Sequence, residues 1–431
     1  MYNTIFSGKE KMSRSSCFFE KGNIVMKRRD FAALLGSAPL LSMAGCSSFL
    51  VKSPRDGALV DTPQKRLDYT QKLLKKLCTD IGPHPTGTPA FHRAAQIIKQ
   101  EMDLSLPSVE FDRFDIALWE LLGKPEFNLG GQDIETFPSF GGEGTPPEGI
   151  SGILKKSGGG FSLADPSTGK ARAQITISTY GKAITHHQGR TNPPSIPSFG
   201  VGKQDVPLLE NAVRDKTPAR MKARIRFTPN ATGLNIIGRL PGKRTDEILV
   251  VAHADTVYCA PGANDNTASV IVMLMMAHAA AGRVSDHTLT FVATDAEEFG
   301  MFGAKHYGAK RMTDGTMKNI RYVANFDSLT YGPNLWISSK DNDIKEIIRA
   351  IHSDLHINAV PKYDDSDGFV MDSDPFRPSG AKAFHANSRG YDEKTLPVYH
   401  RPDDNASSVP LDCVEIGFLV FDEFIKRVDK L

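Results

Sequence analysis

Five candidate metal-ligating residues, placed at the ends of predicted strands or in tight loops, constrain the fold of this chain more than any other feature. In chain order they are His253, Asp265, Glu298, Asp327 and His400. The two densest segments are V-V-A-H-A-D-T-V-Y-C-A-P-G-A-N-D-N-T-A-S, which begins at Val250, and F-V-A-T-D-A-E-E-F-G-M-F-G, which begins at Phe291. If these residues form one site, the fold must bring several strand ends to one edge.

The second half of the chain alternates predicted strands with predicted helices. From Asn235 onward the strand runs are Ile248–Ala252, Thr288–Ala293, Tyr322–Phe326 and Leu335–Ser338, and the helical runs are Ala268–Ala281, Phe302–Lys310, Ile344–Leu355 and Leu411–Arg427. Such alternation is typical of an α/β fold in which helices cover both faces of one sheet. We therefore expect a three-layer α/β/α domain with a mixed, mostly parallel sheet. Its site should lie at the carboxyl ends of the strands, where His253, Glu298 and Asp327 are placed.

The first half of the chain has a different texture. Helical spacing of apolar residues is found over Pro63–Leu77, and a second helix is predicted over Phe91–Met102. Further along, Gly and Pro become frequent, and short alternating segments such as Ala173–Thr179 and Met221–Phe227 are typical of strands. The predicted division of the chain is 63–110 and 231–431 for the α/β domain and 111–230 for an inserted, mainly β module.

The N-terminus has the features of an export signal. Paired arginines follow Met26 in M-K-R-R-D-F, and a short apolar stretch ends in L-S-M-A-G-C. That string resembles a bacterial lipobox, in which Cys46 becomes the lipidated N-terminus, and the arginine pair resembles a twin-arginine signal. We expect residues 1–45 to be the signal, with translation starting at Met26, and residues 46–62 to be a linker. The predicted location is extracytoplasmic, with the lipid on Cys46 as the membrane anchor; Ser47 favours the outer membrane.

The composition argues against two classes of protein. Of the 431 residues, 40% are hydrophobic, which is enough for a large core. Seven of the 52 basic and three of the 50 acidic residues precede Cys46, so the rest of the chain is nearly neutral and lacks the basic face of a nucleic-acid-binding protein. No run of about eighteen apolar residues predicts a spanning helix. Cys78, Cys259 and Cys413 imply no disulfide framework, and the sequence leaves open whether two of them pair.

Histidine nitrogens and carboxylate oxygens are the ligands that zinc prefers in catalytic sites, which keep one coordination position open. Two metal ions about 4 Å apart need a bridging carboxylate and terminal ligands on each side. Asp265 is well placed to bridge, because the G-A-N-D-N turn can aim its short carboxylate into the cleft. His253 with Asp327 would complete one site, and Glu298 with His400 the other. We predict two Zn²⁺ ions, with other divalent metals left open.

Two further acidic residues have predicted roles beside the metal. Asp255 follows His253 by two residues, so on an extended segment it points the same way and can orient the imidazole. Glu297 is not needed as a ligand. A carboxylate beside a ligand can take a proton from the metal-bound water and later deliver it to a leaving amine, which is the role of a general base.

These motifs together resemble one known family. The His-x-Asp, the G-A-x-D-N turn, the Glu-Glu pair, the N-F-D that ends at Asp327 and the Y-H-R-P-D-D that begins at Tyr399 are similar to those of the co-catalytic zinc aminopeptidases. That family includes bacterial leucyl aminopeptidases, aminopeptidase Y and glutamate carboxypeptidase II. The resemblance covers roughly Pro63–Glu110 and Gly233–Leu431. It implies a zinc-exopeptidase sheet, the same five metal ligands and Glu297 as the base.

The resemblance also bears on three further features. Some relatives have a Tyr before the last His ligand that stabilises the tetrahedral oxyanion, and Tyr399 occupies that place. The stretch 111–230 sits where many relatives carry a protease-associated domain, although no specific motif is found there. The segment Met371–Gly380 resembles the family's S-D-H-x-x-F stretch but lacks its His and is shorter, so the substrate preference is not implied.

We therefore expect an exported di-zinc exopeptidase of aminopeptidase type that acts on a peptide or a small amide. Three alternatives stay open. A glutaminyl cyclase-like cyclotransferase uses the same fold with one zinc, and a carboxypeptidase would need a cation such as Arg377, Arg389 or Arg401 to hold a free carboxylate. A receptor-like protein with a dead site would have lost ligands, which this chain retains. The sequence does not indicate the oligomeric state.

Overall fold

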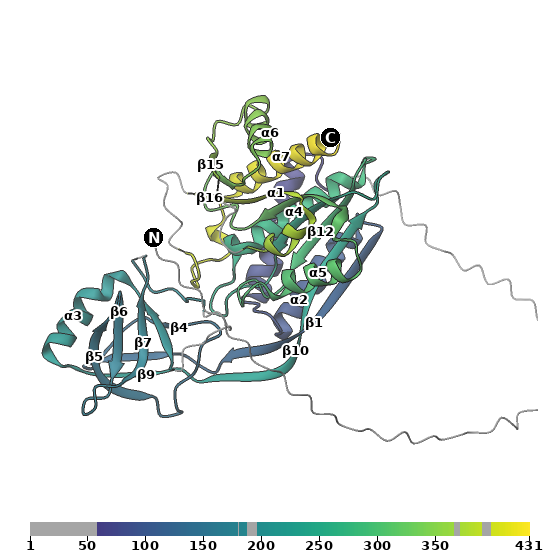
Figure 1. The fold of residues 1–431 in the computed structure, drawn as a ribbon. Helices are drawn as coiled ribbons and strands as arrows, with labels where there is room; N and C mark the ends of the chain where they lie inside the picture. Colours follow the sequence, from purple (N-terminus) through teal and green to yellow (C-terminus); the bar gives the residue numbers. More distant parts are fainter. Residues whose placement is uncertain (1–57, 180, 188–195, 366–370, 390–397) are drawn as a thin grey trace, which may run out of the picture. The chain divides into compact units, whose positions relative to one another are not determined.

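The computed structural model describes residues 58–179, 181–187, 196–365, 371–389 and 398–431. They belong to one compact unit, Lys52–Leu431. Its main sheet (Figure 1) has eight strands, in the order β1 (Ser108–Leu121), β10 (Ile225–Leu240), β12 (Thr288–Thr294), β11 (Glu247–His253), β13 (Ile320–Phe326), β16 (Lys382–Arg389), β14 (Asn334–Ser338) and β15 (Lys362–Asp364). The pairs that join β12, β11, β13 and β16 are parallel, as is the pair of β14 with β15. The pairs β1–β10, β10–β12 and β14–β16 are antiparallel. The predicted mixed α/β sheet is confirmed.

The central strand β11 shows why both faces of this sheet are covered. Every residue from Glu247 to His253 is buried, as expected for a parallel strand packed between two helix layers. Ile248, Val250 and Ala252 belong to the core formed with the first helix layer. Leu249 and Val251 belong to a second core on the opposite face, which includes Tyr307. The strand is therefore apolar along its length until the polar residue that ends it.

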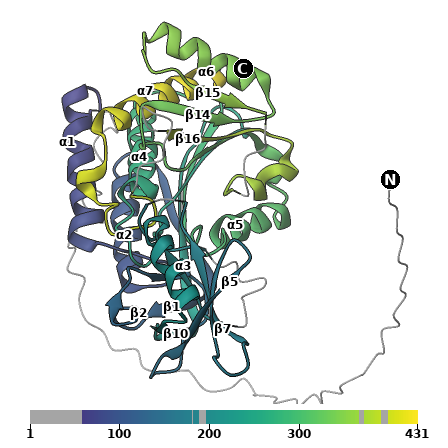
Figure 2. The same ribbon diagram turned by 90° about the vertical axis from the view of Figure 1, so that its left-hand side faces the viewer.

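The helices lie on the two sides that this burial requires (Figure 2). The first layer contains α1 (Pro63–Leu74), α2 (Pro89–Asp103), α4 (Ala268–Ala281) and α7 (Leu411–Val428), and α5 (Phe302–Thr313) covers the other face. Further helices are α6 (Asn342–Asp354) and α3 (Val206–Asp215). In α4 nearly all side chains are buried, because it packs between the sheet and α7. A helix that is apolar all round is expected only in such a place.

A second sheet is formed by residues within 126–222. Its strands are, in order, β3 (Gln132–Asp133), β2 (Glu126–Leu129), β9 (Pro218–Lys222), β5 (Ile150–Ser157), β6 (Gly160–Ala164), β7 (Ala171–Ile177), β8 (Ser198–Val201) and β4 (Phe137–Pro138). It has a separate hydrophobic core, to which α3 contributes Leu209 and Ala212. The strands β1 and β10 remain paired from Ser108↔Arg239 to Leu121↔Ile225, and so run past both ends of the predicted 111–230 module. The module boundaries stay a prediction.

Several predicted elements have different bounds in the structure. The expected strand Met221–Phe227 is divided, because β9 ends at Lys222 and a new strand, β10, begins at Ile225 in the other sheet. The first α-helix ends at Leu74 and continues as a π-helical turn, Lys75–Ile81. The helix α3 was not predicted.

Other predictions concern the chain ends and the thiols. The predicted export signal, Met26 and Cys46 lie outside the described residues. Within the described ranges, no helix has the length and apolar content needed to cross a bilayer. The structure shows free thiols at Cys78, Cys259 and Cys413. No disulfide therefore joins any two of these three residues in this structure.

A buried ion pair fixes the start of β11. The Arg311 guanidinium of α5 donates to both oxygens of Glu247, at 2.6 and 2.9 Å, and also to the Tyr307 hydroxyl at 3.1 Å. The side chains of Arg311 and Glu247 are 3% and 10% exposed. The pair ties α5 to the strand whose far end carries His253.

Replacing Arg311 by Leu should destabilise the protein by about 3–5 kcal/mol, because it leaves the Glu247 carboxylate buried without its partner. Urea denaturation would measure the change in the free energy of unfolding. The matched control is Lys156→Ala, which removes an exposed pair with Glu210 and should cost less than about 1 kcal/mol. Equal effects of the two substitutions would contradict the structural role of the buried pair.

Candidate metal centre

The five predicted ligands come together at the carboxyl edge of the parallel strands. His253 is the last residue of β11, and Asp327 directly follows β13. Glu298 lies in the loop after β12, and Asp265 lies in the turn η3 (Ala263–Thr267) that leads into α4. His400 is in the turn before α7. The common direction of β11, β12 and β13 brings their ends to the same edge, as the sequence predicted.

Asp265 lies between the two histidines and offers one oxygen to each. Its Oδ1 is 3.2 Å from His253 Nε2, and its Oδ2 is 3.3 Å from His400 Nε2. Each histidine has a second carboxylate: Asp327 Oδ1 is 3.7 Å from His253 Nε2, and Glu298 Oε2 is 3.3 Å from His400 Nε2. The arrangement thus has two halves that share one carboxylate.

This donor set fits a divalent metal. Glu298 Oε1 is buried and has no hydrogen-bond partner within the described part of the chain. A buried carboxylate oxygen without a partner is costly. His253, Asp265 and Glu298 each offer a donor atom, and these atoms lie within 4.8 Å of one another. Nitrogen and carboxylate oxygen are suitable zinc ligands. The five residues would hold the metal, with Asp265 shared between the two halves.

The electrostatics of the cluster favour a cation. Burial alone would lower the pKa of His253, but Asp255, Asp265 and Asp327 outweigh it and raise that pKa. Burial would raise the pKa of Glu298, whereas His400 and His187 outweigh burial and lower it. The negative field that favours a charged imidazole would equally attract a divalent ion.

Asp255 connects His253 to the acid pair. His253 Nδ1–H donates to the backbone carbonyl of Asp255 at 3.1 Å, while the carboxylate Oδ1 lies 3.7 Å from Nδ1. The carboxylate instead accepts backbone N–H groups of Glu297 at 3.0 Å and Glu298 at 3.3 Å. The imidazole is therefore oriented by the main chain of Asp255, and the side chain of Asp255 holds the Glu297–Glu298 turn.

Glu297 and Tyr399 lie beside the cluster. Burial raises the pKa of Glu297; His253 opposes this, and Glu298, Asp327 and Asp372 add to it. The Tyr399 ring stacks on the His400 ring, with centroids 3.7 Å apart and planes 20° apart. Burial, together with the charges of Asp265 and Glu298, raises the pKa of the Tyr399 hydroxyl, so the group keeps its proton at neutral pH.

The turn that presents Asp265 is held by Asp404. The carboxylate of Asp404 accepts the Asn264 N–H at 2.8 Å, the Asn264 side-chain amide at 2.9 Å and the Asp265 N–H at 3.1 Å. Gly262 opens the turn at φ +64°, and a Cβ there would lie 2.3 Å from Thr256 Cγ2. Sequence reasoning quoted Asp404 within the Y-H-R-P-D-D motif but gave it no role.

Two further residues near the cluster were missed. His187 Nε2 lies 3.1 Å from Glu298 Oε2; the His186–His187 dipeptide was visible in the sequence, but no spacing linked it to the ligands. Asp372 accepts a hydrogen bond from Thr294 Oγ1, and its Oδ1 is buried with no partner among the residues that the structure describes. Burial raises the pKa of Asp372 to about 7. It belongs to the segment whose departure from the family pattern left the pocket wall undefined.

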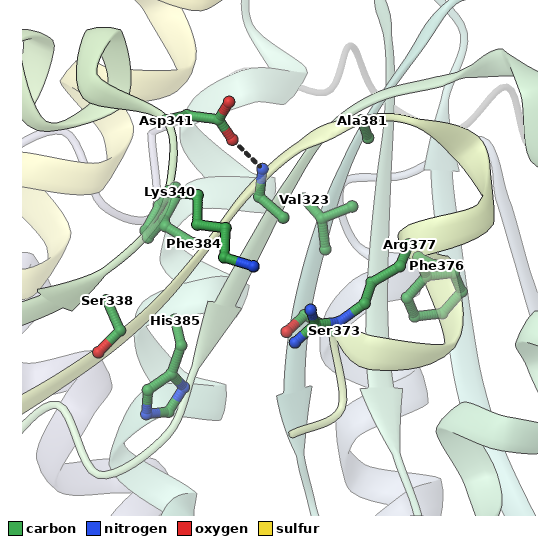
Figure 3. A pocket seen from close by; sticks show the side chains of 11 residues that line it. Val323, Ser338, Lys340, Asp341, Ser373, Phe376, Arg377, Ala381, Phe384 and His385 are labelled. Carbon is green, nitrogen blue, oxygen red and sulfur yellow. Dashed lines mark hydrogen bonds between the residues drawn. The ribbon is translucent and has the colours of Figure 1, made fainter. Parts of the chain in front are cut away.

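A cavity of about 290 Å³ is lined by residues of β13, β16 and the 3₁₀ turn Asp374–Ser379. Figure 3 shows Lys340 and Arg377 reaching into it from opposite sides, with the His385 ring nearby. His385 Nδ1 lies 3.0 Å from the side-chain nitrogen of Asn325, two residues before Asp327. Asp341 also lines this cavity, and Arg377 pairs with Asp374 at 2.7 Å, so its walls carry charges of both signs.

Comparison with known proteins relates this architecture to peptidases. Residues 235–417 match the model of peptidase family M28. Aminopeptidase YwaD of Bacillus subtilis is 26% identical over 372 residues, which cover 79% of this chain and 80% of that protein. The solved zinc aminopeptidase BSAP of Bacillus subtilis superposes with a TM-score of 0.68 at 23% identity, covering 84% of this chain and 95% of that one.

A glutaminyl cyclase from an Acidobacteriales bacterium has a similar fold. It superposes with a TM-score of 0.51 at 14% identity and covers 85% of this chain and 95% of its own. At such identities the solved structures support the fold alone.

Asp404→Asn should weaken metal binding by about 10–100-fold, because an amide would face the N–H donors that now fix the Asp265 turn. Competition with a zinc chelator would measure the affinity. Asp403→Asn is the matched control, since the Asp403 side chain is 48% exposed and pairs with Lys182 and Arg401 instead of with the Asp265 turn. If both variants hold zinc as tightly as the unchanged protein, Asp404 does not orient the ligand.

Proposed function

The chain is a zinc metallopeptidase that resembles the aminopeptidases of peptidase family M28, and on this premise we propose that it is a two-zinc exopeptidase that removes residues from the N-termini of peptides. The single observation that carries the proposal is the position of Asp265. Its two oxygens face two different histidines, each of which has a further carboxylate of its own. A two-metal site needs this division of donors.

Zinc, when bound, polarises the substrate carbonyl and makes a water molecule more acidic. The remaining chemistry is assigned to side chains. Glu297, which is not among the five ligands, accepts a proton from the attacking water as the new C–O bond forms. It then delivers that proton to the leaving amine as the C–N bond breaks. The Tyr399 hydroxyl, beside the His400 ring, donates a hydrogen bond to the carbonyl oxygen as charge develops there.

The alternatives are supported less well. Arg401 is unsuited to hold a substrate carboxylate, because it is buried and pairs with Glu135 and Asp403. The side chain of Arg389 lies outside the described residues. Arg377 is also paired, with Asp374 at 2.7 Å, but it lines the cavity of Figure 3 together with Lys340. That cavity is the observation that keeps a carboxypeptidase as the second candidate. A cyclotransferase is supported only by the fold that the chain shares with a glutaminyl cyclase. A receptor without catalytic activity is disfavoured, because all five predicted metal ligands are present.

Substrate panels test the proposal directly. The zinc-loaded protein should release p-nitroaniline from aminoacyl p-nitroanilides, and a chelator should stop the release. Peptides with a blocked N-terminus and a free C-terminus report carboxypeptidase activity, and N-terminal glutaminyl peptides report cyclisation. Cleavage of only the blocked peptides, or cyclisation alone, would overturn the aminopeptidase assignment.

Glu297→Gln should lower kcat by about 10²–10⁴-fold while both zinc ions stay bound, because the amide cannot carry the proton. The adjacent Glu298→Gln should instead lose metal, since it removes a ligand. Elemental analysis of each purified variant, together with its aminoacyl p-nitroanilide kinetics, separates the two effects. Hydrolysis that persists in Glu297→Gln with metal bound would show that another group is the base.

We also propose that the protein is exported and anchored by a lipid on Cys46, which precedes the described residues. The supporting feature is the lipobox-like L-S-M-A-G-C string. Cys46→Ser should abolish incorporation of a labelled fatty acid and release the protein from the membrane fraction. Cys17→Ser, upstream of the predicted start at Met26, should change neither. Membrane attachment that survives Cys46→Ser would contradict the anchor.

A further inference from the structure

A segment of the predicted inserted module, Ala183–His187, lies against the His400 turn. The Thr185 N–H donates to the His400 carbonyl at 3.3 Å, and His400 Nδ1–H donates to the Thr185 carbonyl at 3.2 Å. Upstream, the Arg401 guanidinium donates to the Ala183 carbonyl. On the other side of the segment, the Phe140 N–H donates to the His186 carbonyl at 2.8 Å. Backbone contacts on both sides therefore set where the next residue, His187, is placed.

The His187 ring is turned toward Glu298. Its Nδ1 lies 2.6 Å from the Glu298 carbonyl oxygen, which can only accept, so Nδ1 carries the hydrogen. The other nitrogen, Nε2, points at Glu298 Oε2 from 3.1 Å. His400 Nε2 approaches the same oxygen from 3.3 Å. Two imidazoles thus face one carboxylate oxygen, and their rings are edge to face with centroids 4.6 Å apart.

The predicted ligand histidines have the same arrangement. In His253, Nδ1 donates to the Asp255 carbonyl and Nε2 faces carboxylates. In His400, Nδ1 donates to the Thr185 carbonyl and Nε2 again faces carboxylates. A metal-binding imidazole usually donates its second N–H in this way, which leaves the first nitrogen free for the metal. His187 has this pattern although it comes from a different part of the chain.

We propose that His187 is a protein ligand of the metal ion held by Glu298 and His400, an inference that rests on the two-zinc site proposed above. One donor atom each from His187, Glu298 and His400 lie within 4.8 Å of one another. With the shared Asp265, this half of the centre has four protein donors. The other half has three, which are His253, Asp327 and Asp265.

Because the two halves have different numbers of protein donors, we expect the two zinc ions to have different roles. A zinc ion with four protein ligands is closed and held tightly, whereas one with three keeps a position for water or substrate. The substrate amide is therefore processed at the half formed by His253 and Asp327, and the module supplies the ligand that closes the other half.

Zinc affinity of the full-length protein at buffered free zinc concentrations tests the inference, with cobalt(II) absorption as a second readout. His187→Phe keeps a ring beside His400 but removes the donor, and His187→Cys restores a donor. The side chain of His187 is 41% exposed, so these substitutions should leave the fold intact, which thermal unfolding of the metal-free variants checks. His186→Ala is the control, because His186 precedes His187 and is not among the grouped donors.

The unchanged protein should bind one zinc tightly and a second more weakly. His187→Phe should weaken the tight site by at least about tenfold and alter the visible spectrum of the first cobalt equivalent, and His187→Cys should recover part of the affinity. His186→Ala should change neither. Two sites of unaltered affinity in His187→Phe would overturn the inference and leave the two-zinc proposal standing. A single zinc in the unchanged protein would instead overturn the two-zinc site and the inference with it.

Discussion

Negative charge gathered at one buried edge is the constraint on which the rest of this structure depends. Asp265, Glu298 and Asp327 lie within a few ångströms of two imidazoles, where water cannot screen their mutual repulsion. Such a cluster is stable only if each oxygen has a partner, and Glu298 Oε1 has none among the described residues. A divalent cation would supply that partner. The surrounding fold can be understood as the means of holding these charges in place until it binds.

The support for the cluster comes mostly from main-chain groups. The Asp255 carbonyl orients His253, the Thr185 carbonyl orients His400, and the Glu298 carbonyl orients His187. The carboxylates of Asp255 and Asp404 in turn accept backbone N–H groups from the loops that carry the ligands. These hydrogen bonds limit how far the ligand side chains can move apart when their charges repel one another.

The second sheet is connected to the chemistry through a few residues. The pairs formed by Arg401 with Glu135, and by Thr185 with His400, join the 126–222 region to the turn before α7. His187 extends this contact to Glu298. The 126–222 region therefore contacts two of the predicted ligands, His400 and Glu298, although it is carried between β1 and β10 of the main sheet.

The sequence by itself determined the α/β class, most of the strands and helices from β11 onward, and the five residues of the cluster. It could do so because an apolar strand that ends in a polar residue is a local pattern, and parallel strands put those ends at one edge. Two features were not accessible in this way: the division of Met221–Phe227 between two sheets, and the contacts made by Asp404 and Asp372. Each depends on a partner far along the chain. His187 is the clearest case. Only the tertiary structure could place it beside Glu298, 111 residues away, because its position is set by backbone hydrogen bonds to the His400 turn and not by any local pattern.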